Sequence, residues 1–353
     1  MLVSSPAPIG TQPVVTSIEI SIKGKWVRVP AMQVNRETIV FRGGWLKMAA
    51  IHDEEWMAIE IENPESYVEA LKERGAHGLR ADLFTFTQKV PGEFPKYSYR
   101  MEWTSVAAIR ISSFKDWWEK LPQETRKNVR RSQKRGVTIQ VKPFDDALIR
   151  GISDVNNDSP VRQGLPNTYY GKTLDQVKND YCAFVDRSDF ICAYSGEEMV
   201  GFLKVVYKGE VASIINLTTK GSHSDKRPAN ALVARAVEVC EAKKVAFITY
   251  GQFNYGNKQH SPLREFKIRN GFEEILKPRY YVPLTVWGSL CMKAGFHRGL
   301  LGILPPRAIT LAVNTRTKWY DVKRSMSRCS STLERPNSDR QMERSIPPAG
   351  SNS

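Results

Sequence analysis

Alternating apolar and polar positions dominate the first third of the chain. Residues 18–30 hold two such runs on either side of a Lys-Gly turn and predict a β-hairpin. Residues 64–75 have helical spacing, opened by a proline and closed by a glycine. Two β-rich runs follow at 81–88 and 97–111. We therefore predict an α+β unit over residues 1–111.

The pattern becomes helical and basic over residues 112–144, which we interpret as a linker. Ser112 and Ser113 are suited to cap its first helix, and Pro122 favours the first position of a second one. Gly136 is expected to end that second helix.

Residues 145–290 have the clearest order of elements. Residues 145–156 and 173–185 are predicted helices, the second with a capping box formed by Thr173 and Gln176. The runs that follow predict β-β-β-α-β-α-β, and their sequences are FICAYS, MVGFLKVVY, VASIINLT, PANALVARAVEVCEAKK, VAFITYG, PLREFKIRN and YYVPL. The predicted fold class is α+β, with a mixed sheet flanked by helices.

The last of these predicted helices, PLREFKIRN, ends at Asn270, Gly271 and Phe272. That order, with the "NGF" turn before a returning strand, resembles the GNAT fold of acyl-CoA N-acyltransferases. The linker stretch "WWEKLPQETRKNVRRSQKRGV" (117–137) resembles that of FemAB-type transferases, which are two GNAT-like domains in tandem acting on cell-envelope precursors. The resemblance spans roughly residues 30–285 and is stronger in the second half. It implies two GNAT-like halves, the first degenerate.

The resemblance also implies where an acyl donor binds. Coenzyme A-binding members have a glycine-rich loop between a strand and a helix, whereas residues 218–230 hold a single glycine. Backbone amides and the helix dipole still favour an anion there. The donor is expected to be a coenzyme A thioester or an aminoacyl-tRNA, which FemAB-type proteins use. The expected donor-side residues of this loop are Gly221, Ser222, His223, Lys226, Arg227 and Asn230.

Acyl transfer to an amine needs a donor for the developing oxyanion and a proton for the leaving group. The resemblance places the oxyanion donors near Asn216 and Tyr250, on splayed strands. Tyr250 or Tyr255 is the candidate proton donor, although Tyr250 also suits a half-buried strand position. Glu102 is a candidate base, with an exposed strand carboxylate as the alternative. Three further donor-side candidates follow the strand: Asn254, Asn257 and Lys258.

A polar loop at 159–172 is expected to form a wall of the acceptor site, or else a surface connection. Its candidate residues are Arg162, Gln163, Tyr169, Tyr170 and Lys172. The linker helix gathers six cations on one half of its surface, which suits the phosphates of a lipid-linked sugar or RNA, or simply a solvated face. These are Arg126, Lys127, Arg130, Arg131, Lys134 and Arg135.

The composition limits the classes of partner that we expect for this chain. The formal net charge of +15 and a pI near 9.6 favour an anionic partner, and DNA is not expected. Five cysteines without a C-x-x-C pair indicate a reducing compartment, and no secretory signal is evident, so we expect a cytoplasmic protein. Neither a metal-binding histidine pattern nor a G-x-S-x-G motif occurs, so neither a metal site nor a hydrolase is expected.

The end of the chain has two predicted parts. Residues 291–322 are amphipathic and suit either the inner face of an anionic membrane or packing on the domain. Residues 323–353 are polar with few apolar anchors, and we expect them to be disordered.

Together these features predict an N-acyltransferase that moves an acyl or aminoacyl group to an amine of a sugar or peptide precursor. Two alternatives stay open. One is an RNA-binding module with a catalytically dead GNAT-like fold, and the other is a non-enzymatic membrane-surface partner in polysaccharide assembly.

Overall fold

The computed structural model describes residues 15–22, 25–57, 59–76, 78–92, 94–162, 165–254 and 261–299. Expected site residues Gln163, Tyr255, Asn257 and Lys258 lie outside these ranges, as do residues 300–322 of the amphipathic segment and the whole predicted tail. Residues up to His297 form one compact unit, which holds all the strands and long helices given below.

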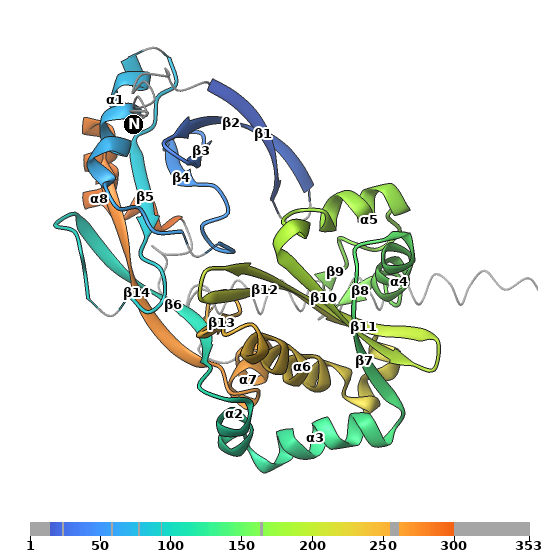
Figure 1. The fold of residues 1–353 in the computed structure, drawn as a ribbon. Helices are drawn as coiled ribbons and strands as arrows, with labels where there is room; N and C mark the ends of the chain where they lie inside the picture. Colours follow the sequence, from blue (N-terminus) through green and yellow to red (C-terminus); the bar gives the residue numbers. More distant parts are fainter. Residues whose placement is uncertain are drawn as a thin grey trace, which may run out of the picture. The chain divides into compact units, whose positions relative to one another are not determined.

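Twelve strands of the described residues form one mixed sheet (Figure 1). Its order is β1-β2-β3-β4-β5-β14-β6-β13-β12-β11-β10-β7. The strands are β1 (Val15–Ile22), β2 (Lys25–Val34), β3 (Glu37–Arg42), β4 (Met48–Ile51), β5 (Leu83–Thr87), β6 (Arg100–Arg110), β7 (Val137–Lys142), β10 (Ser188–Ser195), β11 (Glu198–Lys208), β12 (Val211–Thr219), β13 (Phe247–Thr249) and β14 (Glu273–Pro283). A separate two-stranded sheet pairs β8 (Val161–Arg162) with β9 (Leu165–Pro166).

Helices flank the sheet, so the predicted α+β class is confirmed. The α-helices are α1 (Pro64–Ala76), α2 (Phe114–Lys120), α3 (Gln123–Lys134), α4 (Asp146–Asn156), α5 (Leu174–Tyr181), α6 (Pro228–Ala242), α7 (Pro262–Arg269) and α8 (Val286–Lys293). In the second half, α6 packs on one face of β10, β11 and β12, while α4 packs on the other face of β11 and β12 (Figure 1).

The same order of elements occurs twice. In the first half β2, β3 and β4 are antiparallel neighbours, α1 follows, and β5 returns parallel to β4. In the second half β10, β11 and β12 are antiparallel, α6 follows, and β13 returns parallel to β12. The second series is the one that the sequence pattern predicts, and the chain is built of two halves of similar topology.

The two halves exchange strands at the centre of the sheet. β6 follows β5 in the chain but pairs with β13, whereas β14 follows α7 but pairs with β5, and β6 and β14 pair with each other. The predicted last strand, residues 280–284, is therefore only the end of β14, which begins at Glu273. The first residues of β14 are largely charged and show no apolar alternation, so the sequence pattern predicts no strand there. They form a strand because their backbone pairs with β6.

Most predicted helix ends agree with the structure. Ser113 accepts the N–H of Asp116 as N-cap of α2, and Thr173 forms the expected capping box of α5. Pro122 stands at the N-cap of α3, one position before the predicted one. α5 ends at Tyr181, earlier than predicted.

Candidate functional site

The parallel strands β12 and β13 separate soon after they meet. They pair only over Val211–Ser213 and Phe247–Thr249, while β12 continues to Thr219. Ser213 Oγ and Thr249 Oγ1 lie 2.9 Å apart at the last pair. A bulge that leaves Ile215 unpaired with β11 follows at once, which turns β12 away. The wedge between strands that the resemblance implies is thus present.

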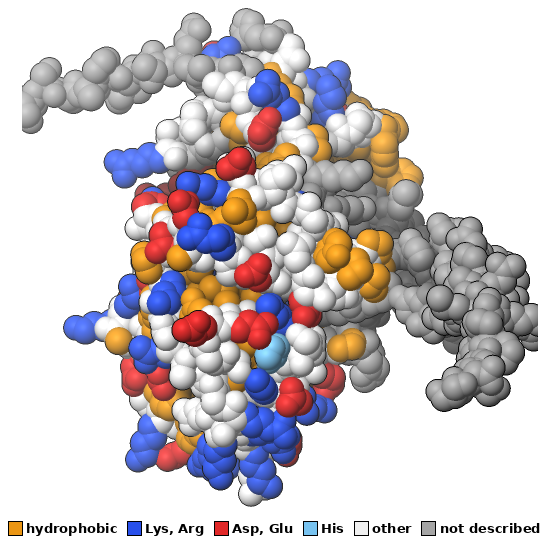
Figure 2. Space-filling model, turned by 90° about the vertical axis from the view of Figure 1, so that its right-hand side faces the viewer, with side chains coloured by type: hydrophobic (Ala, Val, Ile, Leu, Met, Phe, Trp, Pro, Cys, Tyr) orange, Lys and Arg blue, Asp and Glu red, His pale blue; other side chains and the backbone are white. Residues whose placement is uncertain are grey.

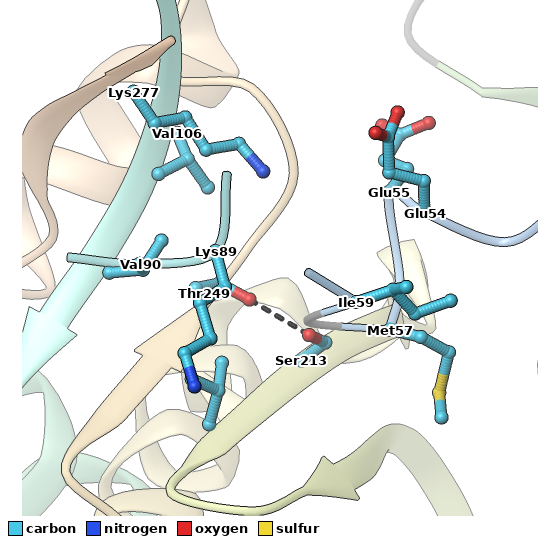
Figure 3. Close-up of a pocket in the computed structure, with 11 residues that line it drawn as sticks. Glu54, Glu55, Met57, Ile59, Lys89, Val90, Val106, Ser213, Thr249 and Lys277 are labelled. Carbon is cyan, nitrogen blue, oxygen red and sulfur yellow. Dashed lines mark hydrogen bonds between the residues drawn. The ribbon is translucent and has the colours of Figure 1, made fainter. Parts of the chain in front are cut away.

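A pocket lies at the closed end of this wedge and takes its walls from both halves (Figure 3). Strands β12 and β13 contribute one side, β6 and β14 another, and the loops after β4 and β5 the remainder. Its lining residues are Glu54, Glu55, Met57, Ile59, Lys89, Val90, Val106, Val211, Ser213, Thr249 and Lys277. Sequence reasoning missed this site, because its charged residues are far apart along the chain.

Lys277 and Lys89 are the two described cations that line the pocket, and Figure 3 shows the amine of Lys277 directed towards the space in front of the carboxyl groups of Glu54 and Glu55. The Nζ of Lys277 donates to Thr87 Oγ1 at 3.3 Å. Burial lowers the pKa of Lys277, and neighbouring Arg279 lowers it further, while the two glutamates act in the opposite direction. The ammonium is therefore held in a site that favours its neutral form, a common property of functional lysines.

Glu54 is buried and both of its carboxylate oxygens are engaged. Oε2 lies 3.1 Å from Arg279 Nη2, and Oε1 accepts the backbone N–H of Thr87. The pairing of β4 with β5 ends at Ala50 and Thr85, so the N–H of Thr87 lies where these strands have separated. Glu54 thus closes the wedge of the first half, and its role there is structural.

Glu55 differs from its neighbour. As a whole residue it is exposed, yet burial around its carboxyl group raises the pKa of Glu55 above the usual value. The cations Arg279, Lys277 and Lys267 act against this rise. A carboxylate with a raised pKa at the mouth of a pocket is suited to accept and release a proton.

Lys267 on α7 lies behind the wedge and is fully buried. Its Nζ donates to the carbonyl of Gln252 at 2.7 Å and lies 4.7 Å from the centre of the Tyr250 ring. Burial lowers the pKa of Lys267 to about 8, against the opposing charge of Glu55. The N–H of Tyr250 donates to the carbonyl of Ala107 on β6 at 2.8 Å, so this backbone donor belongs to the sheet.

Glu102 is not brought together with Tyr250. Its Oε1 lies 2.9 Å from His297 Nε2. It also precedes Ala107, the β6 partner of Tyr250, by five residues, or ~17 Å along the strand. Asn216, another expected catalytic residue, is half-buried on β12 opposite Lys204.

The expected donor loop already holds an anion from this chain. The carboxylate of Asp158, at the end of α4, accepts the N–H of Gly221 and the hydroxyl of Ser222, each at 2.7 Å. Burial opposes its ionisation, but these hydrogen bonds, with Arg162 and Lys220 nearby, lower the pKa of Asp158 below its usual value. In this conformation the loop does not fit the pyrophosphate of coenzyme A, because a carboxylate takes the amide and hydroxyl donors.

Other side chains of the loop also have partners. His223 Nε2 lies 3.2 Å from Glu198, and Lys226 Nζ donates to Ser195 Oγ at 2.7 Å. Arg227, in left-handed backbone conformation, is the N-cap of α6.

Asn230 connects α6 to the "NGF" turn. Its Nδ2 donates to Asn270 Oδ1 at 3.0 Å, and Trp117 Nε1 donates to the carbonyl of Asn270. Gly271 adopts φ +80°, and a Cβ there would lie 2.7 Å from Trp117 Nε1. Phe272 then enters the core. The turn is thus a packing motif that joins α2, α6 and α7.

Asn254 is held at the far end of the wedge. It donates to Glu274 Oε1 at 2.9 Å and accepts from Arg264 Nε at 3.0 Å. Asn254 is the last described residue before 255–260, the stretch that contains the expected donor-side residues Asn257 and Lys258.

The expected acceptor loop packs on α4 and α5. Lys172 Nζ donates to Asp180 Oδ2 at 2.5 Å and lies 5.1 Å from the centre of the Tyr169 ring. Arg162 is half-buried and donates to a carbonyl of α4, while Tyr170 is exposed. Most of the described side chains of this set therefore have structural partners, and Tyr170 is the exposed one among them.

The basic face of α3 is exposed as expected. Arg130 lies over the ring of Trp118 at 5.7 Å, Arg131 faces solvent, and Arg135 pairs with Asp225 at 2.6 Å. Figure 2 shows Lys and Arg side chains gathered at the lower end of the molecule, the level at which α3 lies in Figure 1.

Within the described ranges, no group of three or more His, Cys, Asp or Glu side chains is placed to hold a metal ion. Nor is any helix there both long and apolar enough to cross a membrane.

No family model matches the sequence, and no curated protein matches it either. Several solved structures are similar to this chain. One is FemX, with 10% identity, TM-score 0.46, and coverage of 80% of this chain and 90% of that one. Another is L-PGS from Bacillus licheniformis, with 14% identity, TM-score 0.48, and coverage of 75% and 86%. A third is a tandem GNAT protein from the clavulanic acid biosynthesis pathway, with 10% identity, TM-score 0.41, and coverage of 79% and 85%.

Proposed function

We propose that this chain is an N-acyltransferase that moves an acyl or aminoacyl group onto an amine, and that the reaction occurs in the pocket at the closed end of the β12–β13 wedge. The observation that carries the proposal is the position of Lys277 across from Glu55, beside two diverging parallel strands. The charged pair at this end of the wedge can serve acyl transfer.

In the proposed reaction the amine nitrogen attacks the carbonyl carbon of the donor. A C–N bond forms, and the C–O bond of an ester or the C–S bond of a thioester breaks. Glu55 accepts the proton that the amine loses, since its raised pKa makes it a better base than an ordinary glutamate. The leaving oxygen or sulfur takes up a proton, which protonated Glu55 can return to it. Tyr250, the proton donor expected from the sequence, is not among the residues that line this pocket.

Lys277 is proposed to stabilise the oxyanion of the tetrahedral intermediate. Its ammonium lies in a poorly solvated pocket, where its interaction with a developing negative charge is stronger than in water. The environment lowers the pKa of Lys277, and the negative charge of the oxyanion would act in the opposite direction and favour the ammonium form.

Among the two donor classes, we favour an aminoacyl-tRNA over an acyl-CoA. Asp158 occupies the Gly221 amide and the Ser222 hydroxyl of the loop that would hold a pyrophosphate, whereas the exposed cations of α3 suit RNA phosphates. The proposed acceptor is an amine of a sugar or peptide precursor of the cell envelope, and the proposed location is the cytoplasm.

A transfer assay with purified protein tests the proposal. Lys277→Met and Glu55→Gln are expected to lower kcat by about 100-fold or more each. Lys72→Met, on the exposed face of α1, removes a cation elsewhere and should leave kcat unchanged. Full activity of both pocket variants would place the reaction elsewhere.

The preference for aminoacyl-tRNA over acyl-CoA can be tested by thermal stabilisation. Wild-type protein should be stabilised against heat by charged tRNA more than by acetyl-CoA or longer acyl-CoAs. Asp158→Asn weakens the internal anion and should raise the affinity of the loop for inorganic phosphate and coenzyme A. Efficient transfer from acyl-CoA by the wild type would contradict the choice of aminoacyl-tRNA.

An RNA-binding module without catalysis is the second candidate, favoured by the exposed basic face of α3. It predicts salt-sensitive RNA binding that Lys277→Met leaves intact, together with no transfer by the wild type from any donor of the panel.

A further inference from the structure

A group of large apolar side chains is exposed around α8, on one edge of the first half. They come from the loop after β3, from α8 itself and from the turn that follows α8. This aromatic patch consists of Trp45, Val286, Trp287, Leu290 and Phe296, which are 59%, 79%, 45%, 54% and 38% exposed. Large contiguous apolar surfaces usually mark an interaction site.

The side chains of the aromatic patch are held in place by contacts with one another. The Trp45 ring packs edge-on against Trp287, with centroids 6.3 Å apart, and against Phe296, at 5.4 Å. Trp287 Nε1 donates to the carbonyl of Trp45 at 3.0 Å. On the opposite side of α8, Gly288 lies so close to the carbonyl of Asp82 that a Cβ would be only 2.0 Å away. The helix is thus fixed against the sheet with its apolar side chains outward.

The charges in the segments that carry the patch are positive. Residues 42–48 and 284–299 contain cations and not a single Asp or Glu. The carboxylate of Glu102, from β6, lies 2.9 Å from His297 Nε2 and is an acidic group next to the second of these segments. Lys47 and Lys293 are exposed. The carboxylate of Asp82 is buried and accepts the N–H of Lys47 and the hydroxyl of Thr285, so it is turned away from the surface.

We propose that the aromatic patch docks this protein onto an anionic lipid bilayer. Tryptophans are favoured at the boundary between headgroups and acyl chains, and lysines beside them pair with lipid phosphates. A protein partner of ordinary composition would more often be met by both signs of charge around the apolar centre. The inference rests on surface residues outside the wedge and stands apart from the proposed activity.

Vesicle co-sedimentation tests it. The full-length wild type should bind phosphatidylcholine vesicles that contain phosphatidylglycerol, and bind pure phosphatidylcholine much less. Trp287→Ser with Leu290→Ser should lower the affinity about tenfold or more, because the inserted apolar area is lost. Lys47→Gln with Lys293→Gln should lower it about 20- to 30-fold, since each cation near an anionic surface contributes about fivefold. Phe94→Ser, at a 78% exposed phenylalanine outside the patch, is the matched control and should bind as the wild type does.

Thermal unfolding of each variant is the control for an intact fold, and each midpoint is expected to match that of the wild type. Unchanged vesicle binding by the Trp287/Leu290 variant would overturn the proposal, as would equal binding to neutral and anionic vesicles. A wild type that fails to bind vesicles but forms a dimer in light scattering, lost in the same variant, would show instead that the patch joins two copies of the chain.

Discussion

Gly271 shows how a single residue serves both backbone and packing. Its φ of +80° suits glycine, and its α-carbon faces the Trp117 indole and the Leu121 side chain. The sequence signal for a helix stop at this position was correct. The close approach of Trp117, 154 positions earlier, has no local signal.

Gly271→Ala is expected to destabilise the protein by about 2–4 kcal/mol, because left-handed strain and a clash with Trp117 add. Gly295→Ala is the matched control, since Gly295 has φ +79° but open space where a Cβ would lie. It should cost about 1 kcal/mol from strain alone. Urea unfolding of both variants measures the difference, and equal costs would show that Trp117 moves aside freely.

Lys204 is a buried cation that the apolar pattern of β11 did not reveal. Its Nζ donates to the carbonyls of Tyr181 and Ala183 at the end of α5. Burial lowers the pKa of Lys204 from 10.5 to about 8. Between pH 8 and 10.5 the unfolded state therefore binds more protons than the folded state, so the contribution of Lys204 to stability rises with pH.

The free energy of unfolding of the wild type, minus that of Lys204→Met, should consequently increase from pH 8 to pH 10. The increase can reach about 1.4 kcal/mol per pH unit. Denaturant titrations at several pH values give this difference. Lys208→Met, at an exposed position of the same strand, should give a flat difference. A flat or falling difference for Lys204→Met would mean that its carbonyl partners keep the ammonium charged.

At the scale of elements, α3 illustrates what a helical pattern reveals. Its cations fall on the solvent side and Val129 on the core side, as helical spacing predicts. What those cations bind is a separate matter, because a solvated face and a phosphate-binding face have the same pattern.

Replacing Arg130, Arg131 and Lys134 by Gln should weaken tRNA binding and flatten its dependence on salt. If each cation contacts one phosphate, the slope of log K against log salt should fall by about 2 to 3. Filter binding at several salt concentrations measures the slope. Arg28, Lys72 and Lys208, exposed cations on other elements, give the control variant. An unchanged slope would leave α3 as a solvated face.

At the scale of the whole molecule, the exchange of β6 and β14 joins the halves. β6 is hydrogen-bonded to β13 of the second half, and β14 to β5 of the first. Neither half keeps a complete sheet when the other unfolds, so the described unit is expected to unfold cooperatively.

Urea unfolding should therefore give the same midpoint by tryptophan fluorescence and by far-ultraviolet circular dichroism. Exposed Trp26 and Trp45 and buried Trp117 report on both halves in the fluorescence signal. Two separate midpoints would show that the halves unfold independently despite the shared strands.

The sequence by itself determined many of the elements of this protein, most clearly those of the second half. Local spacing, caps and turns identify the three antiparallel strands, α6, and the "NGF" stop, because periodicity and turn chemistry act over a few residues. Only the tertiary structure decided that β6 and β14 cross between the halves, that Asp158 occupies the expected anion loop, and that Lys277 faces Glu54 and Glu55. These contacts join positions about 60 to 220 residues apart. The local order of apolar and polar residues does not specify which distant segments pair with one another.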